Sequence, residues 1–565
     1  MEWIAPYFEK NAELAVFLAI GVGYWIGKFK IKGVGFGPVT GSLLAGLMIG
    51  SVVHVPVSDT AKSLLFLLFM YGIGYSAGPG FLRGIRDGGW RWVALGIVIP
   101  VTGLLTAYAM AKVLNLEMGY AAGMMSGGLT ESPVIGTASE AIRALPISDE
   151  EKTRLVSQIP IADALTYIFG TFGVIFFCSY IGPWLLRLDL KAEALKVEQD
   201  LGFERETEGV SSGFRMFELR AYEIVPPSPA IGTTVEEAEK RLSSVRVFVE
   251  RVRRNGKIIE VRPDLVLQAH DVVAVIGRQE ALLKVVETHV KEIFDRDILD
   301  VPTATFDVVV TSKTLNGRTV AQIREESEDI RGVFLKSIKR GEEQIPIAPG
   351  TRIFRGDLVT LHGLEPAVRR VSERIGDVLQ GGEGTDFIAL GLAICFGALA
   401  GLVLTFPVGG LHIAMGTSVA VLIVGLGMGW RNSVRPTFAV LPHDAIELMK
   451  SLGLAAFVAM IGLKAGPVFL TALKEIGLTV FLGGIVVTLT PQLVGLVVGR
   501  YVLKLNPLLL LGALAGAQTM TAGLAAVQER SGSPVAVIGY SSTVAFGHIL
   551  ISIGGTALIW MLHSS

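Results

Sequence analysis

The chain has 565 residues, of which 51% are hydrophobic and only 18% are charged, and its formal net charge is −1. Water-soluble domains carry about 25% charged residues, so this composition excludes an ordinary soluble protein and indicates a membrane protein with some soluble mass. The near-zero net charge gives no sign of a nucleic acid or other polyanion as a partner. Its two cysteines, Cys178 and Cys395, lie far apart in apolar segments, which argues against a disulfide framework or a thiolate metal site.

Residues 12–187 contain five long apolar segments, and each approaches the ~20 residues that a membrane-spanning helix needs. They cover residues 14–27, 36–55, 61–80, 92–113 and 160–186. Acidic residues precede the first apolar segment and no small-residue cleavage site follows it, so we expect a retained span rather than a signal peptide. We assign residues 1–190 to a first transmembrane domain.

One further segment, residues 119–143, is apolar at its start but polar at its centre, Gly127-Gly128-Leu129-Thr130-Glu131-Ser132-Pro133. We expect two short helices that meet at a non-helical tip, because glycine permits turns and close backbone approach and proline fits the first turn of a helix. Lipid offers no hydrogen-bond partners, so the N–H groups of the tip must be satisfied by protein, water or ligand. The start of the second helix would favour a carboxylate.

The middle of the chain, residues 206–378, is hydrophilic and contains an internal duplication, which divides it into domains at 206–290 and 291–378. Each copy is expected to form a short helix, a β-hairpin and further strands, with Asp271 aligned to Asp357. The phosphate-binding motifs GxxxxGK and GxGxxG do not occur, so nucleotide chemistry is unsupported.

Basic residues gather on the hairpin of the first copy. They indicate either a solvated surface or a regulatory site for an anionic ligand. The residues concerned are Arg251, Arg253, Arg254 and Lys257.

The last part, residues 386–565, returns to apolar segments and forms a second transmembrane domain. These segments cover residues 386–406, 411–429, 451–470, 477–503 and 535–562, with a second unusual segment at 508–529. The order of motifs repeats that of the first half, which indicates a duplication. The aligned pairs are Ala77-Gly78-Pro79 with Ala465-Gly466-Pro467, Gly127 with Gly516, Thr130 with Thr519, Ser132 with Thr521, Thr166 with Thr543, and Gly170 with Gly547.

Charge in the connecting loops predicts the topology. Basic residues follow the first span and the third span, which places these loops in the cytoplasm and the N-terminus outside. Arg187 and Lys191, after the fifth span, fall on the cytoplasmic side only if residues 119–143 do not cross the membrane. We therefore expect a re-entrant hairpin there and its counterpart at 508–529, with five crossings in each half and hence inverted repeats.

The unusual segments supply the candidate substrate-binding residues. Glu131 either caps a helix or binds ligand, and an ionisable group at membrane depth is costly enough to suggest function. The hydroxyl groups of the tips either donate to a ligand or bond back to a helix carbonyl. The candidates on the two segments are Gly127, Gly128, Thr130, Glu131, Ser132, Gln518, Thr519 and Thr521.

Four residues of neighbouring spans complete the candidate set: Asp163, Thr166, Tyr540 and His548. Asp163 either faces water at a helix boundary or takes part in proton coupling, cation coordination or binding of an α-ammonium group. His548 either bonds a neighbouring helix or titrates near neutral pH during proton-linked transport. No catalytic residue, metal site or cofactor site is predicted, and neither unusual segment contains an arginine clamp for a carboxylate.

The two middle copies, with their "HDVVAVIG" and "GDLVTLHG" strands, resemble the ligand-sensing RCK-C or TrkA-C domains of potassium-channel regulators. Two five-span repeats on either side of such a pair resemble the aspartate–alanine exchanger family of bacterial permeases. This resemblance implies a secondary antiporter of the inner membrane, a homodimer in the lipid bilayer, that moves small carboxylates or amino acids by an elevator-like motion. It implies no enzymatic activity, no cofactor and no nucleic-acid partner.

Two alternatives remain open. A cation–proton antiporter or an ion channel gated by the RCK-C-like domains would use Asp163 and His548, although the channel filter motif TVGYG is absent. A membrane sensor without transport would leave the polar tips unexplained.

Overall fold

A computed structural model describes most of the chain, which divides into two compact units. One unit comprises Met1–Glu198, Lys339–Pro346 and Gly381–Ser565, and the other comprises Gln199–Ile338 and Ile347–Gln380. The residues described are 5–28, 30–31, 34–35, 37–86, 89–201, 217–241, 247–259, 261–278, 282, 290–326, 333–340, 343–379, 385–408, 411–435 and 438–564.

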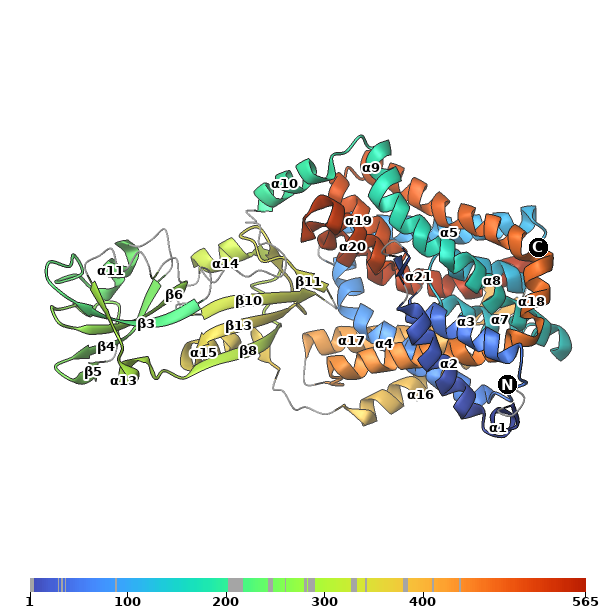
Figure 1. The fold of residues 1–565 in the computed structure, drawn as a ribbon, viewed down its shortest axis with the longest axis horizontal. Helices are drawn as coiled ribbons and strands as arrows, with labels where there is room; N and C mark the ends of the chain where they lie inside the picture. The colour runs from blue at the N-terminus through green and yellow to red at the C-terminus, as the bar shows by residue number, and fades with distance from the viewer. Residues whose placement is uncertain are drawn as a thin grey trace. The chain divides into compact units, whose positions relative to one another are not determined.

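The first half of the larger unit is helical (Figure 1). Its segments are α1 (Ala5–Lys10), α2 (Ala12–Gly27), the short strands β1 (Lys30–Ile31) and β2 (Val34–Gly35), α3 (Pro38–Gly50), α4 (Asp59–Arg86), α5 (Trp90–Val113), α6 (Met118–Gly128), α7 (Pro133–Ala144), α8 (Asp149–Phe176), the π-helical turn η1 (Phe177–Ile181), α9 (Gly182–Leu185) and α10 (Leu190–Leu201). As predicted, residues 119–143 form two short helices, and Pro133 begins the second.

The second half of this unit is also mainly helical. It contains α16 (Phe387–Val403), the hairpin β15 (Thr405–Val408) and β16 (Leu411–Ala414), α17 (Thr417–Val434), α18 (His443–Val497), the π-helical turn η4 (Val498–Val502), α19 (Pro507–Ala517), α20 (Thr521–Ser531), the 3-10 turn η5 (Pro534–Ala536) and α21 (Val537–His563). Among the described residues, four helical segments are long and apolar enough to cross a membrane: Trp90–Val113, Asp149–Leu185, His443–Val502 and Pro534–His563.

Three predicted boundaries were wrong. The predicted spans 451–470 and 477–503 belong to the one helix α18, because the residues between them, Thr471-Ala-Leu-Lys-Glu-Ile476, are mostly strong helix formers with no glycine or proline. The helix that contains the predicted fifth span begins before residue 160, at Asp149, since the Ser148 side chain caps the helix by accepting from Glu151 N–H. The predicted span at 411–429 starts with β16.

Successive parts of α18 pack against different helices. A Cβ atom on Gly462 would lie 2.7 Å from the carbonyl oxygen of Leu43 in α3, and one on Gly484 would lie 2.5 Å from Thr166 Cγ2 in α8. The two regions that the sequence analysis treated as separate spans therefore have separate packing partners, although the helix joining them is unbroken.

One carboxylate links the first hairpin to α17. Glu140, on α7, accepts hydrogen bonds from the backbone N–H groups of Thr417 and Ser418, the latter at 3.1 Å, and from both of their hydroxyl groups. A carboxylate at the start of a helix satisfies free N–H groups and the positive end of the helix dipole. Glu140 thus caps α17 from another helix.

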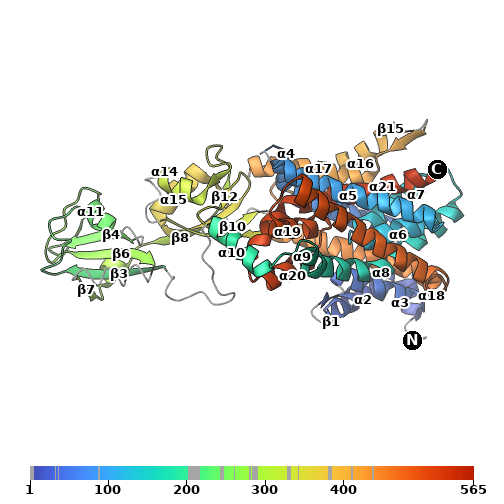
Figure 2. The same ribbon diagram turned by 90° about the horizontal axis from the view of Figure 1, so that it is seen from above.

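The smaller unit contains most of two sheets with corresponding strand order. The first consists of β3 (Phe217–Ile224), β4 (Val247–Arg254), β5 (Lys257–Ile259), β6 (Val272–Arg278) and β7 (Val290–Ile293), in the order β5-β4-β6-β3-β7. The second consists of β8 (Thr303–Val310), β10 (Val333–Arg340), β11 (Glu343–Ile345), β13 (Leu358–Leu364) and β14 (Gly376–Val378), in the order β11-β10-β13-β8-β14. Figure 2 shows β4, β6 and β3 side by side.

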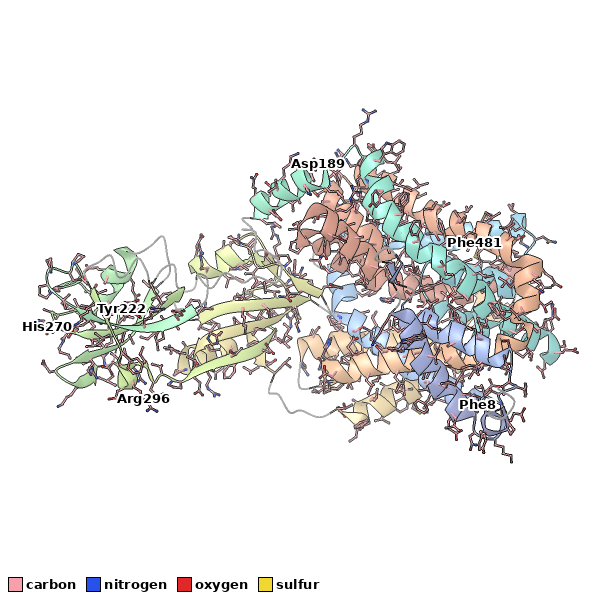
Figure 3. All side chains as sticks on the ribbon, viewed as in Figure 1. Phe8, Asp189, Tyr222, His270, Arg296 and Phe481 are labelled. Atoms are coloured by element: carbon pink, nitrogen blue, oxygen red, sulfur yellow. The ribbon has the colours of Figure 1, made fainter. Side chains whose placement is uncertain are left out.

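Short elements accompany both sheets. They are α11 (Val235–Arg241), α13 (Arg296–Leu299), the strand pair β9 (Arg318–Thr319) and β12 (Arg352–Ile353), α14 (Val320–Glu326) and α15 (Glu365–Ile375). The core of the first sheet includes the fully buried Tyr222, labelled in Figure 3, together with Val252 and Val273. The duplication predicted for residues 206–378 thus corresponds to two sheets of the same strand order.

The basic hairpin of the first sheet is bound to Asp271 within the domain and to residues 295 and 297, just after β7. Arg254 donates to both oxygens of Asp271 at 2.8 and 2.7 Å, and Asp271 is 1% exposed. These hydrogen bonds raise the pKa of the Arg254 guanidinium. Arg253 pairs with Asp295, and Arg251 donates to the carbonyl of Asp297.

We predict that Arg254→Gln weakens the first sheet, because it leaves the Asp271 carboxylate buried without its cation. The expected loss is about 2 kcal/mol of opening free energy, less than for a fully buried pair because the Arg254 side chain is partly exposed. Hydrogen-exchange mass spectrometry of the full-length protein should show faster exchange in β4 and β6. Lys257→Gln, which changes an exposed residue of the same hairpin, is the control, and equal protection in both variants would contradict the prediction.

Candidate site at the two hairpin tips

The two helical hairpins of the larger unit have the same backbone at their tips. In the first, Thr130 N–H donates to Gly127 O at 3.1 Å and Glu131 N–H donates to Ser126 O at 2.9 Å. In the second, the corresponding N–H groups of Thr519 and Met520 donate to the carbonyls of residues 516 and 515, at 2.8 and 2.9 Å. This pair of bonds is the Schellman motif, which ends a helix with one residue in the left-handed region. The protein itself satisfies these N–H groups of the tips.

The left-handed residue is a threonine in both tips. Thr130 and Thr519 each have φ of 56°. A β-branched residue in this region is a steric outlier that costs about 1–3 kcal/mol, and glycine would avoid the cost. A threonine tolerated at both equivalent positions indicates that its side chain has a role.

The threonine hydroxyl groups join the two tips. Thr130 Oγ1 donates to the carbonyl oxygen of Gln518 at 2.7 Å, and Thr519 Oγ1 donates to Glu131 Oε2 at 2.8 Å. A longer contact of 3.4 Å links Thr519 Oγ1 to Thr130 O. The two segments predicted from sequence to be equivalent therefore meet tip to tip.

Glu131 is the charged centre of this contact. It is 1% exposed. His548 Nδ1 lies 3.1 Å from both carboxylate oxygens, and Ser552 Oγ donates to Oε1 at 3.2 Å. Together with Thr519, three side chains from α21 and the opposite tip surround one carboxylate, which offsets the cost of burying it. The His548 side chain is 31% exposed, so the buried acid has a more accessible side chain as its direct neighbour.

Glycines allow each hairpin to lie against its neighbouring helix. A Cβ atom on Gly127 would lie 2.2 Å from Thr166 Oγ1, and one on Gly516 would lie 2.6 Å from Thr543 Oγ1. Thr166 donates to the carbonyl of Ala162 at 2.8 Å, a bond back to its own helix. The predicted Gly–Thr correspondence of the two halves is therefore a matching close contact, α6 on α8 and α19 on α21.

Among the described residues, the remaining candidates make no hydrogen bond to Glu131. Thr521 Oγ1 lies 3.1 Å from Tyr540 Oη. Ser132 is buried, and Ile135 N–H donates to its carbonyl. Asp163 on α8 is 1% exposed, and its Oδ1 has no hydrogen-bond partner within the part of the chain that the structure describes. For Gly128, an added Cβ would lie 3.1 Å from Val487 Cγ1.

Sequence reasoning missed a buried polar chain behind the second tip. Gln492 Nε2 donates to Gln518 Oε1 at 2.7 Å, and Gln518 Nε2 donates to the carbonyl of Thr488 at 3.3 Å. Thr488 Oγ1 donates in turn to Gly128 O at 2.8 Å. The signal available was the presence of polar residues inside an apolar span.

Ser552 was also missed. It lies four residues after His548, and residues at this spacing share one helix face. In the described ranges, His, Cys, Asp and Glu side chains do not gather in the groups of three or more that would hold a metal ion.

We predict that Thr519→Val destabilises the larger unit, whereas Thr519→Ser does not. Valine keeps the β-branched shape and the backbone strain but removes the donor to a buried carboxylate, a loss of about 1.5–3 kcal/mol. Thermal unfolding of the full-length protein in detergent measures the difference. Equal melting temperatures for the two variants would show that the Thr519–Glu131 bond contributes nothing.

Comparison with known proteins places the chain in a family. A protein-family model described as a predicted permease membrane region matches residues 15–183 and 388–560 of the sequence, and the family model of the TrkA-C domain matches residues 219–289. Both matches agree with the resemblance found from sequence.

Three relatives, each named as an uncharacterized transporter, are similar to this chain over nearly their whole length. The protein from Bradyrhizobium diazoefficiens is 43% identical, covering 92% of this chain and 100% of the relative. Those from Shewanella oneidensis and Bordetella bronchiseptica are 38% and 34% identical, covering 100% and 99% of this chain and 100% and 98% of the relatives. The chain therefore belongs to the aspartate–alanine exchanger family of membrane permeases and carries a TrkA-C domain in its central region.

Proposed function

We propose that the protein is a secondary active antiporter that exchanges small carboxylates or amino acids, of the aspartate–alanine type, across the bacterial inner membrane. The observation that carries the proposal is the buried Glu131 carboxylate, held where the two hairpin tips meet. Family membership supports transport in general, and the chemistry of the tips supports the substrate class. An ionisable side chain at this depth is costly and is the default candidate for ligand contact.

The donors around Glu131 suggest how a substrate binds. An α-ammonium group carries N–H donors that replace those of Thr519 and Ser552 on the carboxylate. The two freed hydroxyl groups then donate to the substrate carboxylate. Aspartate and alanine differ by one negative charge, so their exchange moves net charge across the membrane. The site binds both amino acids because the groups it contacts, the α-ammonium and the carboxylate, are present in each of them.

Alternating access requires the tips to separate. The bonds from Thr130 to Gln518 and from Thr519 to Glu131 close the contact in this structure. We propose an elevator-like motion in which the substrate replaces these bonds on one side and then the other. Two tips with the same Schellman geometry and the same threonine conformation support a pair of inverted repeats about this contact.

Exchange by proteoliposomes tests the transport proposal. Vesicles loaded with alanine, aspartate or a C4-dicarboxylate should take up a labelled member of this group by counterflow, and failure with all of them would exclude the proposal. Glu131→Gln should lower the rate at least tenfold, because a hydrogen bond to a charged group is worth ~1.5–3 kcal/mol. Glu475→Gln changes an exposed carboxylate of the same unit and should stay within about twofold of the unmodified protein.

A cation–proton antiporter is the second candidate, and the contact between Glu131 and His548 favours it. Such a pair offers a carboxylate for a cation and an imidazole nitrogen that can carry a proton. In the same vesicles, a pH-sensitive dye distinguishes the candidates: proton movement driven by Na⁺ or K⁺ without any carboxylate would favour this function over the first.

The proposed topology places both hairpins in the membrane without crossing it, the first entering from outside and the second from the cytoplasm. Cysteines introduced at Asn115 and at Glu150, before α6 and at the start of α8, should then both react with an impermeant reagent added outside. Labelling from opposite sides would show that α6 and α7 together cross the bilayer and that the halves are not inverted.

We also propose that the central domains regulate transport in a homodimer and bind an anionic ligand at the hairpin Arg251, Arg253, Arg254 and Lys257. Arg254 has a structural partner in Asp271, so its substitution would confuse the two roles. Lys257→Gln separates them. A changed transport rate at unchanged KM supports regulation, and an unchanged rate argues against it.

A further inference from the structure

We propose that η1, which continues α8, forms with α9, α10 and α20 a binding site for the headgroup of an anionic phospholipid. The inference goes beyond the exchange function and does not depend on it. A cavity of about 920 Å³ lies here, and its polar and aromatic lining consists of Tyr180, Trp184, Arg187, Asp189, Lys191 and Arg530. Figure 3 labels Asp189, just before α10.

The charge of the cavity favours an anion. Arg187, Lys191 and Arg530 are three cations against the single carboxylate of Asp189, whereas the whole chain has a net charge of −1. The Asp189 side chain is already engaged, because its Oδ1 accepts from the N–H groups of Lys191 and Ala192 at 2.9 and 3.2 Å. A phosphate group can accept hydrogen bonds from all three cations.

An aromatic stripe leads from the membrane-spanning part of α8 to this cavity. Phe172 stacks on Phe176 with ring centroids 5.7 Å apart, and Phe176 stacks on Tyr180 at 5.2 Å. Trp184 continues the spacing of four residues and is 76% exposed. Such a stripe suits acyl chains, and Tyr and Trp are typical of the level at which lipid headgroups lie. A small soluble anion would use the cations and leave the stripe uncovered, so we commit to a phospholipid.

Arg530 gives the site a link to the second hairpin. It is at the end of α20, its guanidinium carbon lies 4.2 Å from the centre of the Tyr180 ring, and it donates to the carbonyl of Ser179. Helix α20 also packs on α8 and η1. A phosphate held by Arg530 together with Arg187 and Lys191 therefore links the C-terminal end of α20 to α9 and α10. Arg187 and Lys191 are also the residues whose charge predicts a cytoplasmic position, the side on which anionic lipids attract basic residues.

Lipid binding to the full-length protein in detergent tests the proposal. The probes are phosphatidylglycerol and phosphatidylcholine with brominated acyl chains, and the signal is quenching of tryptophan fluorescence, with Trp184→Phe identifying the local component. Phosphatidylglycerol should bind at least tenfold more tightly. Arg187→Gln, Lys191→Gln and Arg530→Gln combined should remove this preference, since each basic residue near an anionic lipid contributes about fivefold.

The matched control replaces three exposed basic residues elsewhere, Lys28, Arg91 and Arg435, by Gln and should keep the preference. If the combined pocket variant does not fold, Lys191→Gln alone, at an exposed side chain, should still lose about fivefold. Equal binding of both lipids by the unmodified protein, or a preference that survives the pocket substitutions, overturns the proposal. Displacement of the lipid by millimolar glycerol 3-phosphate also overturns it, because the site would then bind a free anion.

Discussion

The Glu131 carboxylate is a buried charge inside a membrane region, and its need for hydrogen-bond donors governs the arrangement around it. The donors come from the opposite tip, through Thr519, and from α21, through His548 and Ser552. A buried carboxylate without such partners would be neutralised or expelled. The tips and α21 must therefore converge, which in turn requires glycine at positions 127 and 516, where a side chain would separate the helices.

Behind the charged contact, uncharged groups hold the second tip in place. The amide of Gln518 is bound by Gln492 and donates to Thr488 O, both residues of α18, and the Thr488 hydroxyl reaches back to Gly128 in the first hairpin. Each polar group in this series of hydrogen bonds has a partner within the protein, which is necessary because lipid offers none. Helix α18 consequently touches both hairpins at the level of their tips, and the site is the meeting point of the two hairpins, α18 and α21.

Sequence reasoning located the two tips because glycine, threonine, glutamate and proline are conspicuous in apolar segments, and the internal repeat connected Thr130 with Thr519. It also identified His548, because an ionisable side chain is costly within an apolar span. It failed for Ser552, Thr488 and Gln492, since single polar residues in a helix have no visible partner until the fold is known. Helix α18 was predicted as two spans because residues 471–476 separate its two apolar segments, whereas Lys474 and Glu475 are good helix formers. Similarly, the spacing of Arg254 and Asp271 does not reveal their pairing across β4 and β6.

The cap that Glu140 provides for α17 has a mechanical consequence. Moving α7 away from α17 would leave two backbone N–H groups and the half-buried Glu140 carboxylate without hydrogen-bond partners. The two helices are therefore coupled more tightly than packed apolar surfaces would be. Any rearrangement that opens the tips while this cap persists must carry α17 along with α7. In the proposed elevator-like motion, the boundary between moving and stationary parts would then run elsewhere, for example between α3 and α18, where glycines such as Gly46 and Gly462 bring the two backbones together.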